Sequence, residues 1–285
     1  MIFDLLSRLP HLPVSPEAGL LISAFVISVA AALIVLIHNR RLLRRPVEDT
    51  SDLGAVFENP ASLLPHIIEL RDRLIKSLIA IIIGTVLATL MSQQILALLA
   101  APIGGLEALQ AIRVTEPFGT FFRVALVMGI ILASPYVITQ IWVFVAAGLK
   151  PTERRVFYLF VPFAVALFLS GVLFAYTMML PVAVPFLVTF MGINATPTLE
   201  DYVSFVTNVL LWVGISFEMP LILFVLAKLK IVTTAMLVKN WRIAVVLIAT
   251  LAAVVTPTPD PVNMGIVAAP LVALYLLSIV LTLFA

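Results

Sequence analysis

Long apolar runs alternate with short polar segments along most of the chain. A helix that crosses a membrane needs about 20 mostly apolar residues. These runs predict an all-α polytopic membrane protein with seven spans, expected at Leu20–Ile37, Ser77–Ala101, Val124–Leu149, Val156–Leu180, Val203–Ala227, Ile243–Thr256 and Met264–Phe284. The last two flank "TPTPDPVN", whose three prolines cannot continue a helix, so we expect a hairpin of two short spans there.

The run from Val156 to Phe190 is long enough for one span or for two. Pro181 and Pro185 favour a single span that ends near Leu180. With one span, all but three of the 17 lysines and arginines fall on the same side of the membrane, whereas two spans would move the last basic cluster to the other side. Because basic residues collect on the cytoplasmic side, the sequence predicts an outside N-terminus and a cytoplasmic C-terminus.

The first expected span differs from the others in its flanking charges. Asp4 and Glu17 precede it and the basic "HNRRLLRR" follows it, whereas a cleavable signal peptide carries positive charge before its apolar run. We therefore expect residues 1–45 to form an additional N-terminal membrane anchor. Residues 46–60, "PVEDTSDLGAVFENP", are acidic and lack periodicity, which is typical of a cytoplasmic linker. Residues 61–285 remain as a six-span core.

The composition supports a membrane protein, and the residue types and motifs argue against several kinds of catalytic and metal-binding site. The chain is 62% hydrophobic and only 11% charged, which a soluble domain of 285 residues does not match. It has no cysteine, and its three histidines fit no metal-binding spacing. The sequence has no Gly-rich phosphate loop and no nucleophile–base arrangement. We expect no enzyme activity, no cofactor, no metal site and no nucleic-acid partner, because topology accounts for the basic residues.

Two acidic residues lie in segments expected at the cytoplasmic surface. Glu69 belongs to "SLLPHIIELRDRL", an amphipathic stretch that also suits an interfacial anchor. Glu153 belongs to the turn "LKPTERR", where a local ion pair or a helix N-terminal acid is the simpler interpretation. If the two carboxylates face each other, they form a site for cationic donors that bind in a bidentate manner, and guanidinium is the best of these.

Glu218 lies within an expected span, in "GISFEMP". A carboxylate at that depth is costly, so its side chain is expected to face the protein interior or water. A neutral acid satisfied by a neighbouring helix is one interpretation. A proton-coupling site of a secondary transporter is another, although the sequence shows no internal repeat of the kind such transporters have. An intramembrane enzyme would need paired catalytic groups, which the spans lack.

Five segments occur in order along the core: "HIIELRDRL", "PFGTFFRVAL", "SPYVITQIWVFVAAGLKPTERR", "SFEMPL" and "VVTPTPDPVNM". Together they resemble the TatC family, the receptor subunit of the twin-arginine protein translocase, over roughly residues 60–285. The sequence departs from the family in its hinge, "TPTPD" where T-P-P-D is usual, and at Met264, near which the family usually has a glutamine.

The resemblance implies a receptor that binds twin-arginine signal peptides at its cytoplasmic face and supports protonmotive-force-driven export of folded proteins. It implies that Glu69 and Glu153 bind the paired arginines. It places an aromatic residue, Phe144, beside them, and it implies that the site is shaped by Arg71, Arg73, Arg154 and Arg155.

The resemblance also implies that Glu218 is a functional intramembrane acid. It assigns partner contacts and self-association to outward loops and to the last hinge, at Pro102, Glu116, Pro117, Phe118, Thr256, Pro257 and Asp260. The expected partners are TatA-type and possibly TatB-type single-span subunits, packed near Phe205–Phe224 and Ile243–Thr256, in a homo-oligomer. The expected location is a bacterial or archaeal plasma membrane.

Overall fold

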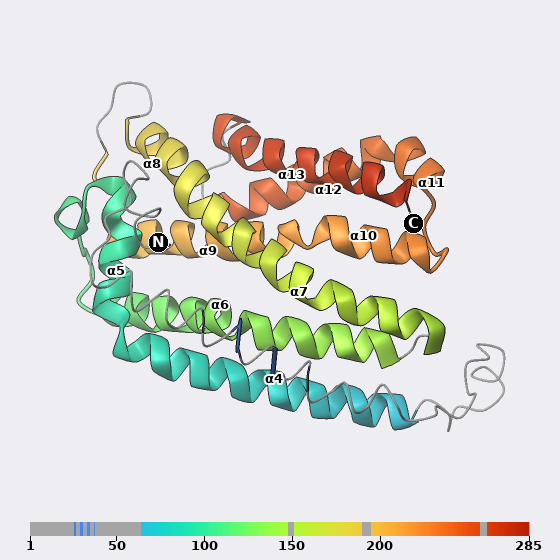
Figure 1. Cartoon of the computed structure of the whole chain (residues 1–285). Coiled ribbons are helices and arrows are strands. Elements are labelled where there is room, and N and C mark those ends of the chain that lie inside the picture. The colour runs from blue at the N-terminus through green and yellow to red at the C-terminus, as the bar shows by residue number, and fades with distance from the viewer. Residues whose placement is uncertain are drawn as a thin grey trace, which may run out of the picture.

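The computed structural model describes residues 26, 29, 30, 33, 34, 37, 64–147, 151–189, 195–256 and 261–284, with the backbone alone at 64–66, 147, 151–159, 262 and 263. The expected linker and most of the expected first span lie outside these residues. Within the described residues all regular structure is helical, apart from one isolated bridge between Gln110 and Thr198 (Figure 1). The predicted all-α class is therefore confirmed.

The helices follow one another with short connections. Their order is α4 (Leu64–Leu90), α5 (Ser92–Ala100), η3 (Ala101–Ile103), η4 (Leu106–Ala108), α6 (Glu116–Ala147), α7 (Pro151–Phe174), the π-helical turn η5 (Ala175–Met179), α8 (Leu180–Val188), α9 (Leu199–Phe217), α10 (Met219–Lys228), α11 (Thr234–Lys239), α12 (Trp241–Val255) and α13 (Pro261–Thr282).

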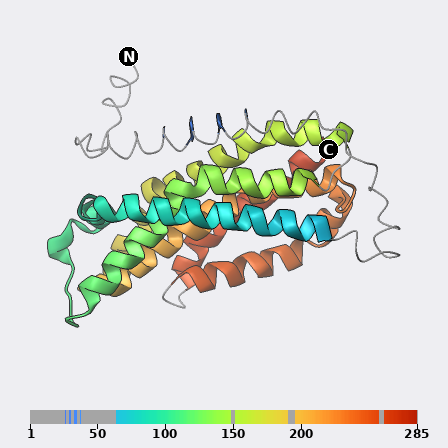
Figure 2. The same ribbon diagram turned by 90° about the horizontal axis from the view of Figure 1, so that it is seen from below.

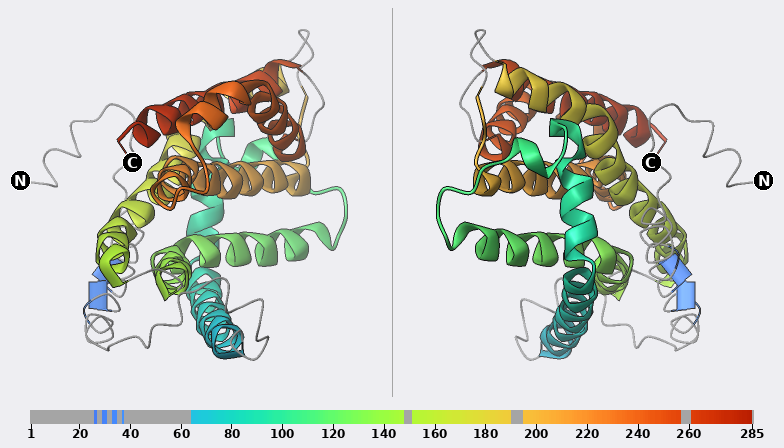
Figure 3. Two further views of the ribbon diagram at one scale, coloured as in Figure 1. Left: turned by 90° about the vertical axis from the view of Figure 1, so that its right-hand side faces the viewer. Right: turned by 90° about the vertical axis from the view of Figure 1, so that its left-hand side faces the viewer.

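The long helices run side by side between two ends of the bundle (Figures 1 and 2). We call one the Glu69 end, where α4 and α7 begin and α6 and α10 finish. The other is the Glu116 end, where α6 and α9 begin and where α5, η3 and η4 lie across the bundle. Viewed along the bundle, α4 lies at one edge beside α6, and α12 and α13 lie at the opposite edge (Figure 3).

Within the described residues, five helical stretches are long and apolar enough to cross a membrane, and α12 is one of two shorter apolar helices. At 1.5 Å per residue, the 15 residues of α12 extend about 22 Å, less than a hydrocarbon core of about 30 Å. The short length expected for Ile243–Thr256 is found in α12, although its crossing of the membrane stays a prediction. The candidate span Met264–Thr282 agrees with the expected span Met264–Phe284, but α13 is not short, because its 22 residues extend about 33 Å. The count of seven spans and the orientation remain predictions.

Two expected helix boundaries are wrong. The expected span Ser77–Ala101 is divided at Met91, and α5 turns away from α4 (Figure 1). The span expected to end near Leu180 is longer than predicted. Its helical path from Phe160 continues through η5 and α8 to Val188. Pro181 is in the first turn of α8, where a missing N–H costs no hydrogen bond.

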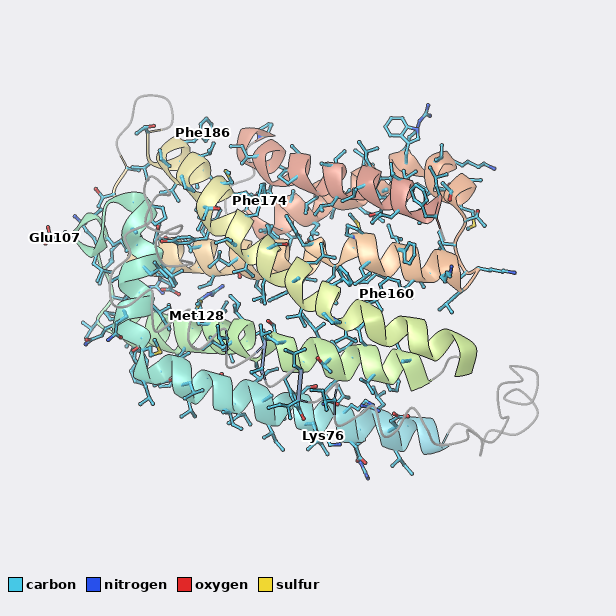
Figure 4. The ribbon with its side chains drawn as sticks, viewed as in Figure 1. Lys76, Glu107, Met128, Phe160, Phe174 and Phe186 are labelled. Carbon is cyan, nitrogen blue, oxygen red and sulfur yellow. The ribbon has the colours of Figure 1, made fainter. Side chains whose placement is uncertain are left out.

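Buried side chains from α4 through α13 form the core, with α6 and α9 contributing the largest shares. Glycines set how closely some of these helices approach each other. A Cβ added at Gly84 of α4 would lie 2.4 Å from the carbonyl oxygen of Gly129 in α6, so the two backbones are in contact. A second close contact joins Gly171 of α7 to Phe217 of α9. The ring centroid of Phe174, also in α7, lies 5.6 Å from that of Phe217; Phe174 is labelled in Figure 4.

Candidate functional site

The expected cytoplasmic site residues that the structure describes lie together at the Glu69 end. Glu69, Arg71 and Arg73 occupy the first turns of α4, and Phe144 occupies the last turn of α6. The backbone of α7 begins at Pro151, so it places Glu153 in its first turn at the same end (Figure 1). The side chains of Glu153, Arg154 and Arg155 lie outside the described part of the chain.

Arg73 fixes the position of Glu69 and ties α4 to α6. Nε of Arg73 donates to Oε1 of Glu69 at 3.0 Å, and Nη2 donates to the same oxygen. The remaining branch, Nη1, donates to Oε1 of Gln140 at 3.2 Å. Gln140 is buried within α6, whereas the Glu69 side chain is 32% exposed. The arginine therefore holds an accessible carboxylate against a buried amide.

The hydrogen bonding of Glu69 is incomplete among the described residues. Both bonds from Arg73 end on Oε1, and no described residue donates to Oε2. An ionised carboxylate has two acceptor oxygens, and charged donors form its strongest hydrogen bonds. One oxygen of Glu69 therefore remains available to a donor from outside the described residues.

The other two described residues of the expected site differ in their surroundings. Arg71 forms an exposed pair with Asp72, in which Nη2 lies 2.9 Å from Oδ1. It makes no described contact with Glu69. Phe144 is half-buried and lies one turn beyond Gln140 on the same face of α6. The structure thus brings Glu69, Arg73 and Gln140 into contact, with Phe144 on the adjacent turn.

Glu218 lies at a break between two helices. It separates α9 from α10, and Pro220 follows in the first turn of α10, where it supplies no N–H. The side chain is 9% exposed, and neither carboxylate oxygen has a hydrogen-bond partner among the described residues. The structure therefore places Glu218 in the protein interior, one of the two environments expected from the sequence.

Glu116 is the first residue of α6 and joins three segments at the Glu116 end. Its Oε2 accepts the backbone N–H groups of Ile112 at 2.9 Å and Arg113 at 3.2 Å. Its Oε1 accepts the N–H of Glu200, in the first turn of α9, at 2.8 Å. The side chain is only 5% exposed. These contacts stabilise the connection before α6 and attach it to α9.

The remaining residues assigned to the outward loops and the hinge differ in how exposed they are. Pro102 is half-buried in η3, whereas Pro117 is exposed and Phe118 is 70% exposed. Thr256 is buried, and its hydroxyl donates to the carbonyl of Ala252 at 2.9 Å. The other two hinge residues, Pro257 and Asp260, lie outside the described residues.

Sequence reasoning missed several polar contacts because each joins residues far apart in the chain. Gln140, the partner of Arg73, was visible only as an isolated polar residue in an apolar run. Arg123 reaches from α6 to Thr207 and Asn208 of α9. Two tyrosine hydroxyls donate to backbone carbonyls at the end of α5: Tyr176 donates to Leu98 and Tyr202 donates to Leu99.

Among the described residues, no group of three or more His, Cys, Asp or Glu side chains could hold a metal ion.

Comparisons with known proteins agree with the resemblance found in the sequence. A family model described as "Sec-independent protein translocase protein (TatC)" matches residues 65–270. The TatC protein of Carboxydothermus hydrogenoformans is 40% identical over 230 residues, covering 80% of this chain and 95% of that protein. The TatC protein of Deinococcus radiodurans is 39% identical over 231 residues, covering 78% of this chain and 86% of that protein.

The fold agrees with solved structures as well. A crystal structure of the twin-arginine translocase receptor TatC matches with a TM-score of 0.68 at 34% identity, covering 77% of this chain and 98% of that one. A second crystal structure of the receptor, in DDM, matches with a TM-score of 0.70. The chain therefore belongs to the TatC family, the non-enzymatic membrane receptor subunits of the Sec-independent, twin-arginine protein translocase.

Proposed function

We propose that this chain recognises twin-arginine signal peptides at the Glu69 end, where Glu69 and Glu153 accept the paired guanidinium groups. The observation that carries the proposal is the partly exposed Glu69 carboxylate, with one oxygen held by Arg73 and the other without a described donor. An incoming guanidinium suits such an acceptor because its donors are always charged and form a planar fork. The positive-inside distribution supports a cytoplasmic location for this end.

The neighbours of Glu69 have separate roles in this proposal. Arg73 positions the carboxylate, and Gln140 holds Arg73 through its third branch. Phe144 supplies an apolar surface for the peptide beside the acids. Arg71, Arg154 and Arg155 surround the site with positive charge, which disfavours a cationic peptide that does not place its arginines on the two carboxylates.

The proposed task is the export of folded proteins across a bacterial or archaeal plasma membrane, driven by the protonmotive force. Membership of the TatC family and the helices long enough to cross a membrane support a membrane location. TatA-type and TatB-type single-span subunits are the proposed partners. The outward residues Pro102, Pro117 and Phe118, together with the hinge after α12, are proposed to serve partner contact and self-association. Buried Glu116 holds the connection before α6 in place, and exposed Phe118 gives the contact an apolar group.

Signal-peptide binding to the purified chain tests the proposed receptor site. We expect Glu69→Gln and Glu153→Gln each to weaken binding of a twin-arginine peptide about ten- to hundredfold, because each removes charge-assisted hydrogen bonds of about 1.5–3 kcal/mol. Glu107→Gln is the matched control, since Glu107 is an exposed acid at the Glu116 end (Figure 4). A twin-lysine peptide should bind weakly to every variant. If the parent and the Glu69 and Glu153 variants bind the peptide equally well, the proposed site is wrong.

Glu218 is proposed to meet a polar group of a single-span partner that packs on α9, α10 and α12. An unpartnered buried carboxylate is costly in a membrane-spanning helix, so a partner donor would relieve that cost. These helices carry exposed apolar side chains, among them Ile222 and Val246. A photocrosslinker at Ile222 should capture TatA-type or TatB-type subunits, and one at Leu87 of α4 should not. Equal capture at both positions would argue against this docking surface.

A further inference from the structure

Arg123 is a charged residue of a membrane-spanning helix to which the proposed function gives no role. Its Nε donates to the hydroxyl oxygen of Thr207 at 3.2 Å, and its Nη2 donates to Oδ1 of Asn208 at 3.0 Å. Both acceptors belong to α9 and both are neutral. The described residues contain no carboxylate paired with Arg123, because the ion pairs found among them join Arg71 to Asp72 and Arg73 to Glu69.

The guanidinium of Arg123 has N–H donors that the contacts with α9 do not use. Arginine carries five N–H donors in a planar fork, and the two contacts with α9 use two of them. Asn208 uses its oxygen to accept from Arg123, which leaves its amide N–H groups for another acceptor. Both side chains are half-buried rather than enclosed. The two residues therefore present several donors and a positive charge at an accessible position between α6 and α9.

A buried hydroxyl lies one turn away on the same helix. Thr120 is 3% exposed, and its Oγ1 has no hydrogen-bond partner among the described residues. Residues three apart lie on one face of a helix, so Thr120 and Arg123 share a face of α6. A buried hydroxyl without a partner is unfavourable. Thr120 therefore adds a second unused donor close to the free donors of Arg123.

The depth of Arg123 indicates what kind of acceptor is available. The 32 residues of α6 extend about 48 Å, which exceeds a hydrocarbon core of about 30 Å by about 9 Å at each end. Arg123 is the eighth residue of α6, about 10 Å along it, and so lies close to the boundary between headgroups and hydrocarbon. Phe118 and Phe122 lie nearby with ring centroids 4.8 Å apart, and both are exposed. These rings give the same end of α6 an apolar surface that lipid chains can contact.

We propose that Arg123 and Asn208, with Thr120 one turn nearer the Glu116 end, bind the phosphate of an anionic phospholipid headgroup in the leaflet at the Glu116 end. A phosphate is the acceptor that the bilayer supplies at this depth, and its oxygens match the fork of an arginine. A carboxylate from a partner helix at the same level would itself have to be desolvated, whereas the lipid phosphate already lies there. The bound lipid would occupy the outer part of the contact between α6 and α9.

Lipid binding to the delipidated full chain in a neutral detergent tests the proposal. Phosphatidylglycerol and phosphatidylcholine are titrated separately, with thermal stability and native mass spectrometry as readouts. We expect phosphatidylglycerol to bind and stabilise the parent, and Arg123→Gln to weaken that binding about tenfold. Arg113→Gln is the matched control, because Arg113 is an exposed arginine at the same end. It should leave phosphatidylglycerol binding unchanged.

Several outcomes would overturn the proposal. Phosphatidylglycerol binding that is equal in the parent and Arg123→Gln would do so, as would equal binding of the two lipids to the parent. Inorganic phosphate is a further arm, and stabilisation by phosphate alone equal to that by the lipid would exclude a headgroup as the source. If Arg123→Gln does not fold, Arg123→Lys, which keeps the charge and loses the fork, should bind phosphatidylglycerol several-fold more weakly than the parent. Unchanged binding by this variant would also contradict the site.

Discussion

Glu69 and Glu116 are carboxylates near the first turns of helices at opposite ends of the bundle, and they differ in how fully their oxygens are used. Both oxygens of Glu116 accept backbone N–H groups, three in total, and the side chain is almost fully buried. One oxygen of Glu69 accepts from Arg73, and the other has no donor among the described residues. A fully used carboxylate stabilises the chain's own loops, whereas one with an unused oxygen can bind a ligand.

Glu218 extends this comparison to the membrane interior. Neither of its oxygens has a described partner, yet it is as shielded from solvent as a core residue. The three acids therefore form a series, from all acceptors used through half used to none used. The number of carboxylate oxygens without a donor agrees with the role proposed for each acid. These roles are loop attachment for Glu116, peptide recognition for Glu69 and partner contact for Glu218.

The largest effect is expected where α4 rests on α6, because that contact positions Glu69. Gly84→Val would place a side chain where a Cβ already comes within 2.4 Å of the Gly129 carbonyl oxygen. We expect a loss of about 1–3 kcal/mol or more in unfolding free energy from overpacking. Displacement of α4 should also break the bond from Arg73 to Gln140 and weaken peptide binding. Thermal unfolding and peptide titration measure the two effects.

Gly119→Ala provides the control for that substitution. Gly119 lies in the first turn of α6, and nothing lies within 4 Å of an added Cβ. Alanine is the better helix former, so this variant should be as stable as the parent or slightly more stable. If Gly84→Val and Gly119→Ala behave alike, the close contact of α4 and α6 does not determine the geometry of the site.

Glu116→Gln should separate stability from binding. The substitution removes the negative charge that three N–H groups share, so we expect a lower melting temperature. Peptide affinity at the other end of the bundle should not change in the folded protein. Thermal unfolding in detergent, with Glu107→Gln as the exposed control, measures the first effect. A fall in peptide affinity without a fall in stability would contradict the loop-attachment role of Glu116.

Gln140→Leu is expected to have the smallest effect. It removes a neutral acceptor from Arg73 while leaving the two bonds from Arg73 to Glu69 in place. A hydrogen bond of about 1 kcal/mol corresponds to about a fivefold loss of peptide affinity, which fluorescence anisotropy can resolve. Gln93→Leu, at an exposed position of α5, is the control. An affinity loss as large as that of Glu69→Gln would mean that Gln140 contacts the peptide directly.

The apolar pattern predicted much of the fold because membrane helices are specified by length and composition. It located the core helices, and it predicted that Glu218 would face the interior or water because an exposed acid in lipid is too costly. It failed at Pro181 and Pro185. Pro181 lies in the first turn of α8, directly after the π-helical turn η5, where its missing N–H costs little, and Pro185 lies inside α8 without ending it.

The sequence identified the acidic residues of the candidate site, but it did not predict their hydrogen-bond partners. Glu69 was named from its place in an amphipathic cytoplasmic segment and from the family resemblance, whereas Glu116 was named from the resemblance alone. Their difference depends on partners distant in the chain, such as Gln140 for Arg73 and the backbone of Glu200 for Glu116. Packing of whole helices sets these contacts, and local sequence carries little information about them.

The most direct test of the account is a double-mutant cycle between Glu69 and each arginine of a twin-arginine signal peptide. Binding is measured for the parent and Glu69→Gln, each with the native peptide and with a peptide in which one arginine is replaced by glutamine. The account predicts a coupling energy of about 1.5–3 kcal/mol with at least one of the two arginines. Energies that add to within about 0.5 kcal/mol for both arginines would contradict direct recognition by Glu69.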